Sequence, residues 1–307
     1  MKSKIVTTAC LFLTAIIWGF AFVAQFYGAG EVGDFAMNGL RFPLGTLSLL
    51  PVMFIFERGR SGREERKKTV IASLCAGTAL FIASTLQQVG ISVSKSVGIS
   101  GFLTGLYTIF VPIACYLFFK KKTGINVLVS AFLAVGGIFM LCIKPGVGFS
   151  FGFGELLLLV GAFFWTAHVV IVDRLGKDIR SLHFCVGQFF VCSVWSVLLM
   201  VIFEMPTLEG IRAAAIPILY AGVLSVGVAY TLQVIGQKRA DPTFASIIFS
   251  TESVFSAIGG VIFGIDVISF VGYLGCLLIF VGIVISQIDF KKKKAPPEER
   301  FGRVKIN

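Results

Sequence analysis

Ten long apolar stretches run through the chain, separated by short segments that carry most of its charge. They cover approximately residues 5–27, 36–56, 69–89, 97–119, 126–143, 154–172, 183–203, 212–235, 242–263 and 268–288. A helix needs roughly 20 apolar residues to cross about 30 Å of hydrocarbon. The chain is 56% hydrophobic and only 14% charged, more apolar than one soluble core can bury. This pattern predicts an all-α integral membrane protein of ten transmembrane helices.

The positive charges are divided unequally between the loops on the two sides of these stretches. Of the 27 Lys and Arg residues, 23 share a side with both termini, three lie in the opposite loops, and Arg41 lies within a helix. Cytoplasmic loops of membrane proteins carry such an excess. We therefore predict cytoplasmic termini and a basic cytoplasmic tail at 291–307. The net charge of +11 has this origin, so no nucleic-acid partner is expected.

The chain contains an internal repeat. A shift of 147 residues places Met53–Glu57 on Met200–Glu204, Trp18 on Trp165 and Arg41-Phe42 on Gln188-Phe189, and one residue less places Thr85–Gln87 on Thr231–Gln233. The repeats are predicted at 1–145 and 146–290, with five helices each. Because five is odd, the second repeat inserts upside down relative to the first. Inverted repeats of transporters place the binding site at their interface near the midplane.

Several short motifs give the chain a family resemblance. They are Ile17-Trp18-Gly19-Phe20, Leu40-Arg41-Phe42, Gly101-Phe102-Leu103-Thr104, Val111-Pro112, Ala245-Ser246 and Thr251-Glu252-Ser253-Val254-Phe255. In this order they resemble the EamA type of the drug/metabolite transporter superfamily, over residues 5–290. Ser253 stands where that family usually has proline. The resemblance implies ten helices as two EamA-like repeats, a multi-pass location in the bacterial plasma (inner) membrane, no cofactor, and transport of small metabolites through a central cavity.

Glu252 is the first candidate functional residue. It lies about ten residues from the cytoplasmic end of its helix, or roughly 15 Å at 1.5 Å per residue, near the bilayer centre. A carboxyl group at that depth is costly and is a functional candidate. It can couple transport to protons or serve as a counter-charge for a cationic substrate. The alternative is a structural glutamate that hydrogen-bonds across helices.

Arg41 and two small-residue stripes are the next candidates. Arg41 is expected to pair with another helix or to snorkel to the headgroups, and an anionic substrate group could also use it. Pro112 belongs to a stripe in the fourth stretch, and Ser246, Ser250 and Ser253 belong to one in the ninth. Small residues at helical spacing favour close packing. Pro112 removes a backbone hydrogen bond, which favours a site between these helices.

Aromatic and histidine side chains complete the candidates. The aromatic residues Trp18, Trp165, Tyr107 and Tyr230 form walls for a metabolite or pack within the bundle. His168 lies inside the sixth stretch, where it can line the pathway. With His183 as the only other histidine and no Cys/His spacing typical of a metal site, no metal is expected.

These features predict a secondary transporter that moves a small metabolite, such as an amino acid, an amine or a drug-like solute, by alternating access. Proton-coupled export is one version of this prediction. The alternative is a facilitative channel or an exchanger without proton coupling. The sequence carries none of the common hydrolase or phosphate-binding motifs, so no enzymatic activity is expected. The expected partners are a small-molecule substrate and the lipid bilayer, with the chain acting as a monomer or homodimer.

Overall fold

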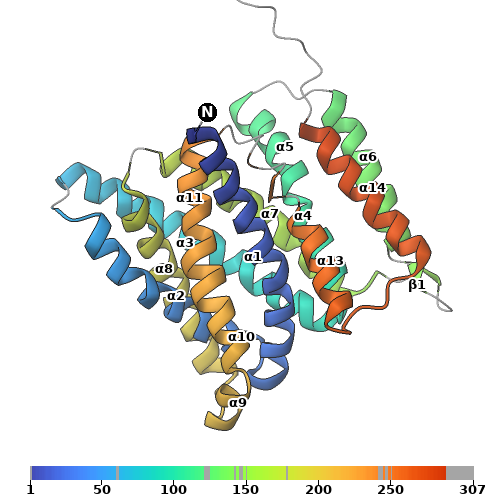
Figure 1. Ribbon diagram of the computed structural model, residues 1–307, viewed down its shortest axis with the longest axis horizontal. Coiled ribbons are helices and arrows are strands. Elements are labelled where there is room, and N and C mark those ends of the chain that lie inside the picture. The colour runs from blue at the N-terminus through green and yellow to red at the C-terminus, as the bar shows by residue number, and fades with distance from the viewer. Residues whose placement is uncertain are drawn as a thin grey trace, which may run out of the picture.

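The computed structural model of the protein describes residues 2–59, 62–120, 125–141, 143–144, 148–149, 151–177, 179–240, 245, 248–249 and 251–287. The predicted tail at 291–307 and the stripe residues Ser246 and Ser250 lie outside this part of the chain. Helices form almost all of the described structure (Figure 1). The first half contains α1 (Lys2–Val32), α2 (Asp34–Phe56), α3 (Arg63–Ser94), α4 (Val97–Gly105), α5 (Tyr107–Phe119) and α6 (Ile125–Leu141).

The second half repeats this order of helices. It contains α7 (Phe153–Leu175), α8 (Ser181–Phe203), a nearly continuous helical run from α9 to α11, then α13 (Glu252–Ile262) and α14 (Phe270–Gln287). The run consists of α9 (Leu208–Ala213), α10 (Ala215–Leu219), the π-helix η1 (Tyr220–Ala229) and α11 (Tyr230–Arg239). Between the halves, β1 (Ile143–Lys144) and β2 (Gly148–Phe149) form a short antiparallel pair that the helical pattern did not predict.

The outer surface of the bundle is apolar. Large side chains such as Phe118, Phe132 and Ile216 are 78%, 87% and 80% exposed. Within the described residues, seven helical segments are long and apolar enough to cross a membrane, and three shorter apolar helices lie at Val129–Met140, Glu252–Ile262 and Phe270–Ile285. An apolar surface this extensive is stable in lipid rather than in water. The protein is a multi-pass membrane protein.

The contacts between helices follow the internal repeat. The equivalent helices α2 and α8 pack on each other, as do α6 and α14, and α4 of the fourth span packs on α13 of the ninth. In addition, α3 packs against α7 and α8, while its counterpart, the run of η1 and α11, packs against α1 and α2. Figure 1 shows α6 and α14 side by side at one edge of the bundle. The two halves are therefore related by an approximate two-fold axis.

Two glutamates at equivalent positions each cap the start of a helix in the other repeat. Glu57 follows α2, and its Oε2 accepts hydrogen bonds from the N–H groups of Leu182 and His183 at the start of α8, both at 3.1 Å. Glu204 follows α8, and its Oε2 accepts from Phe35 and Ala36 at the start of α2, at 2.7 and 3.0 Å. Each carboxylate satisfies N–H groups that a helix start leaves unpaired. Since each helix begins where the other ends, α2 and α8 are antiparallel.

The fourth and ninth helices are interrupted in the same way. The N–H of Leu106 bonds the carbonyl three residues earlier, and the Leu106 carbonyl accepts from the N–H groups three and four residues later. Thr251 makes the same three bonds. The residues that follow, Tyr107 and Glu252, therefore each begin a new helix inside the bundle. Pro112 lies within α5, which continues through it, so the interruption of the fourth helix falls before the proline.

Candidate functional site

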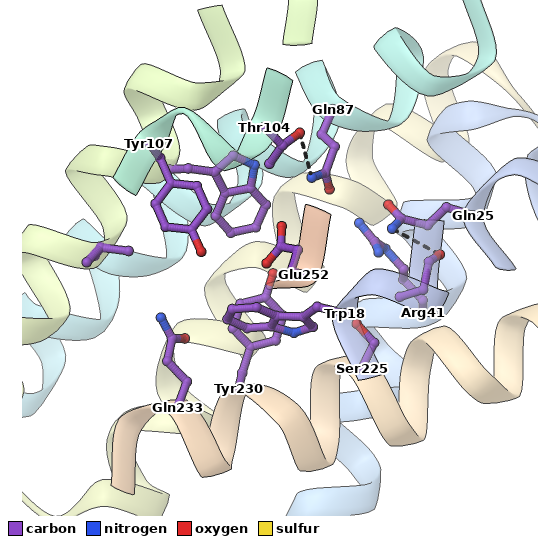
Figure 2. Close-up of a pocket in the computed structure, with 13 residues that line it drawn as sticks. Trp18, Gln25, Arg41, Gln87, Thr104, Tyr107, Ser225, Tyr230, Gln233 and Glu252 are labelled. Atoms are coloured by element: carbon purple, nitrogen blue, oxygen red, sulfur yellow. Dashed lines mark hydrogen bonds between the residues drawn. The ribbon is translucent and has the colours of Figure 1, made fainter. Parts of the chain in front are cut away.

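A narrow, partly open cavity lies at the centre of the bundle, between helices of both repeats. Figure 2 shows its polar side chains converging from several helices, with Glu252 near the middle. Five of the eight predicted candidates line it, namely Trp18, Arg41, Tyr107, Trp165 and Glu252. The other lining residues are Ala21, Gln25, Gln87, Thr104, Val169, Ser225, Tyr230 and Gln233.

Several lining residues are equivalent in the two repeats. Trp18 of α1 and Trp165 of α7 are related by the 147-residue shift, and Gln87 of α3 and Gln233 of α11 by one residue less. Tyr107 and Glu252 each follow the interruption of their helix. The cavity therefore lies at the interface that the inverted repeat predicts for a binding site. These two equivalent positions differ in their side chains, a phenol at Tyr107 and a carboxyl group at Glu252.

Three aromatic rings form one wall of this cavity. Tyr230 lies between Trp18, at 4.7 Å between ring centroids, and Trp165, at 6.3 Å with nearly parallel rings. Figure 2 shows Trp18 and Tyr230 lying together beside Glu252. The indole Nε1 atoms of both tryptophans are buried, without a hydrogen-bond partner in the described part of the chain. Such a wall can contact an apolar or cationic group and still donate hydrogen bonds.

Glu252 places a carboxyl group in the cavity. Its side chain is 3% exposed, and its Oε2 has no hydrogen-bond partner among the residues that the structure describes. The buried Tyr107 hydroxyl lies close enough to interact with the Glu252 carboxyl group, without a hydrogen bond of standard geometry to any described residue. Figure 2 shows both groups facing the cavity, with Arg41 on the opposite side of Glu252. A buried carboxyl group with a spare oxygen can accept a proton or a hydrogen bond from a bound solute.

Arg41 turns its guanidinium group into the protein. The side chain is 3% exposed, Nε donates to Asn38 Oδ1 at 2.9 Å, and the guanidinium carbon lies 4.8 Å from the centre of the Phe42 ring. The prediction that Arg41 snorkels to the headgroups is therefore wrong, because these contacts and the bundle hold it inside. No carboxylate of the described chain forms an ion pair with it. It can bind an anionic group in the cavity.

Pro112, His168 and Ser253 do not line the cavity. Ser253 Oγ donates to the Gly101 carbonyl oxygen at 3.0 Å, where α13 crosses α4, which fits its predicted role in close packing. His168 Nε2 lies 2.9 Å from Gln188 Oε1, behind the wall of aromatic rings. Gln188 is the counterpart of Arg41. The same position thus holds a charge at the cavity in one repeat and supports the packing of α7 on α8 in the other.

Three glutamines line the cavity although they are absent from the predicted set of candidates, and Tyr230 lines it as a member of the predicted aromatic wall. Gln25 Nε2 donates to the Ala21 carbonyl oxygen, and Gln87 Nε2 donates to Thr104 Oγ1. The Oε1 atoms of Gln25 and Gln233 are buried without a partner in the described residues. The repeat held the signal for two of them, since Gln87 and Gln233 are equivalent polar residues within apolar stretches.

Comparison with known proteins gives the same class of protein as the fold and the cavity. The pattern of the EamA-like transporter family matches residues 6–143 and again residues 152–287. The chain therefore belongs to the EamA-like transporter family, which is part of the drug/metabolite transporter superfamily. The resemblance found from the sequence motifs is confirmed.

Two relatives and one solved structure are similar over most of the chain. An "Uncharacterized transporter" of Archaeoglobus fulgidus is 26% identical over 91% of this chain and 84% of its own length. The "Uncharacterized transporter YoaV" of Bacillus subtilis is 25% identical over 91% of this chain and 96% of its own. A structure described only as "Crystal structure of protein" has a TM-score of 0.66 at 19% identity, covering 91% of this chain and 96% of that one, and shows the same fold.

Proposed function

We propose that the protein is a secondary transporter that carries a small organic solute across the plasma membrane by alternating access. The observation that carries the proposal is the central cavity, which lies at the interface of the two repeats and holds Glu252 and Arg41 without an ion pair between described residues. Buried ionisable groups are expensive within a membrane and are retained at substrate and ion pathways. Rocking of one repeat against the other opens such a cavity to each side in turn.

The chemistry of the cavity suits a solute with both an amine and a carboxylate. Glu252 can bind the cationic group, Arg41 the anionic group, and the aromatic wall the remainder of the solute. The unpartnered Oε1 atoms of Gln25 and Gln233 can accept further hydrogen bonds. The substrate class that fits is an amphoteric metabolite such as an amino acid, with amines and other small organic solutes as weaker ligands.

Glu252 is also the proposed coupling residue. A carboxyl group that faces the cavity can be protonated when the solute leaves and deprotonated when a cationic group binds. Transport would then move a proton against the solute, as in a proton-coupled exporter. The hydrogen bonds that Gln88 and Ser92 donate to Asp34 tie α3 to α2 at the outer end of the bundle. Because these hydrogen bonds close the outer end of the cavity, the structure favours a carrier over a continuously open channel.

The proposed topology has ten spans, as repeats at 1–145 and 146–290 in a bacterial plasma membrane, with both termini in the cytoplasm. The three short apolar helices then complete the seven longer spans. Reporter domains that are active only outside the cytoplasm test this arrangement. A fusion after residue 30 should be active and a fusion after residue 64 inactive. The opposite result would invert the topology.

The direct test compares the protein with Glu252→Gln in proteoliposomes. Glutamine keeps the shape of the side chain but cannot release a proton. With a mixture of radiolabelled amino acids and amines, we expect the variant to lose transport driven by an imposed pH gradient. It should retain exchange of solute, which needs no net proton movement. Full gradient-driven transport by a monodisperse variant would remove Glu252 from the coupling step.

A further inference from the structure

A second and very small cavity, with room for about one water molecule, lies between α7 and α11 on the side of the bundle assigned to the cytoplasm. It is lined by Val172, Asp173, Gly176, Lys177, Val234, Gln237 and Lys238. Neither the proposed binding cavity nor the packing of the repeats accounts for this space. Its lining comes from the two helices that supply Trp165, Val169 and Gln233 to the central cavity.

The two cavities follow one another along the same two helices. On α7, Val169 lines the central cavity and Val172 lines the second; on α11, Gln233 lines the central cavity and Gln237 the second. Residues three or four apart lie on one face of a helix, about one turn or 5.4 Å apart. The second cavity therefore lies one helical turn from the central cavity, towards the cytoplasm.

Gln233 and Gln237 provide acceptor atoms along this line. Both side chains are almost fully buried, at 1% and 4% exposed, and the Oε1 atom of each has no partner within the described chain. Buried amide oxygens are normally hydrogen-bonded, so both atoms are available to accept a hydrogen bond from water or from a solute. They can accept successive hydrogen bonds from the amine of a passing solute.

The cytoplasmic end of this line is closed by a lysine. Lys238 follows Gln237 on α11, and its Nζ donates to the Ile179 carbonyl oxygen in the segment between α7 and α8. Beside it, Lys177 Nζ lies 3.0 Å from Asp173 Oδ1. The Lys238 contact joins α11 to the segment after α7, whereas the Lys177–Asp173 pair lies within the end of α7. Separation of the two helices therefore breaks the Lys238 contact and leaves the Lys177–Asp173 pair intact.

The equivalent position on the outer side is closed more completely. A shift of 146 residues, the one that overlays Gln233 on Gln87, places Lys238 on Ser92. The Ser92 Oγ atom donates a hydrogen bond to Asp34 Oδ1 at 2.5 Å. Gln88 Nε2 donates to the same Asp34 oxygen at 3.3 Å and to the Gln25 carbonyl oxygen at 3.4 Å. In the outer seam Gln88 and Ser92 both donate to Asp34, although Gln88 Oε1 has no partner among the described residues either; the inner seam differs in holding a pocket.

We propose that the solute passes between the central cavity and the cytoplasm along the seam of α7 and α11, and that the contact of Lys238 with Ile179 closes this route. When α7 and α11 separate, the second cavity widens into a transit site for the amine group of the solute, with Gln237 as its acceptor. This inference rests on the proposed transport function, but it can fail while transport itself is real.

The test uses cysteine variants and a membrane-impermeant, positively charged thiol reagent added from the cytoplasmic side of inside-out vesicles. Val172→Cys and Gln237→Cys introduce smaller side chains into the second cavity. Phe163→Cys is the matched control, because Phe163 lies on the same helix and is 55% exposed to lipid. The protein with only its native cysteines gives the background rate.

We expect Val172→Cys and Gln237→Cys to react about tenfold faster than Phe163→Cys, and the modification to block transport of the radiolabelled amino acids. Adding Lys238→Gln should raise the reaction rate at Val172→Cys several-fold. The route is wrong if the unmodified protein transports but neither cysteine reacts faster than the control, or if modification leaves transport unchanged. Failure of the unmodified protein to transport any solute would instead count against the proposed function, because the reaction rates are measured without transport.

Discussion

The side-chain hydroxyls of Thr46 and Ser193 lie 3.2 Å apart, and the two residues are separated by 147 positions, the same shift that overlays the two halves of the chain. Equivalent residues can touch only where their symmetry axis passes between them. The approximate two-fold axis therefore runs through the crossing of α2 and α8. Each of these helices is capped by the glutamate that ends the other, Glu57 on α8 and Glu204 on α2.

The Thr46–Ser193 contact should contribute to the packing of the repeats. Each hydroxyl also donates to a carbonyl of its own helix, Thr46 to Phe42 and Ser193 to Phe189, so the proton that joins them is shared. A double-mutant cycle with Thr46→Val and Ser193→Ala should therefore give a coupling free energy of at most about 0.6 kcal/mol, the average for hydrogen bonds between membrane helices. Thermal or denaturant unfolding in mild detergent measures it. Strictly additive effects of the two substitutions would show that the hydroxyls do not stabilise each other.

The two glutamate caps, Glu57 on α8 and Glu204 on α2, should contribute equally to the free energy of unfolding. Glu57→Ala and Glu204→Ala each leave two N–H groups at a helix start without their carboxylate, and each should cost about 1 kcal/mol of unfolding free energy. Glu64→Ala is the control, because Glu64 is exposed in the first turn of α3. If Glu57→Ala and Glu204→Ala melt at the same temperature as Glu64→Ala, the two carboxylates do not stabilise the helix starts.

The Glu57 cap should also depend on pH. Burial raises the pKa of Glu57, but hydrogen bonds from His183 and from the N–H groups of Leu182 and His183 outweigh this and lower the pKa below its ordinary value. A lowered pKa stabilises the fold above the unfolded value of about 4.3, and this contribution is lost as the pH falls below it. The difference in melting temperature between the protein and Glu57→Gln should therefore shrink from pH 7 to pH 4. A constant difference would contradict this prediction.

The crossing of α4 and α13 should tolerate no added atom. A Cβ at Gly101 would lie 1.8 Å from Ser256 Oγ and 2.5 Å from Ser256 Cβ. Gly101→Ala should therefore destabilise the fold by about 1–3 kcal/mol, as overpacking does. Gly30→Ala is the matched control, because nothing lies within 4 Å of its added Cβ and alanine favours helix. Similar folded yield and melting temperature for both variants would show that the helices can separate there.

Arg41 should select for an anionic group on the solute. Arg41→Gln makes the position resemble its counterpart Gln188 and removes the charge. We expect the KM for amino acids to rise about tenfold or more, since a hydrogen bond to a charged group contributes roughly 1.5–3 kcal/mol. The KM for simple amines should change little. Arg212→Gln, an exposed arginine of α9, is the control. An equal loss for amines and amino acids would make Arg41 a structural residue.

The sequence alone gave a good account of the helices and of their family. Long apolar runs predicted the helical segments because a chain in lipid must satisfy its backbone hydrogen bonds internally, and helices do so along one segment. The repeat was also visible, since Trp18 and Trp165, and Glu57 and Glu204, are equivalent positions that the structure uses in equivalent ways. The sequence motifs led to the EamA family, which the family comparison confirmed.

Tertiary structure decided which polar residues reach the cavity and where the helices break. Arg41 could face lipid headgroups or the interior, and only its contacts with Asn38 and Phe42 set its direction. The fourth helix breaks at Leu106 and continues through Pro112, and the part before the break, α4, packs against α13 and α7. Apolarity is a property of a segment and can be read from sequence. The direction of a side chain depends on neighbours that are distant along the chain, and only the packed structure brings them together.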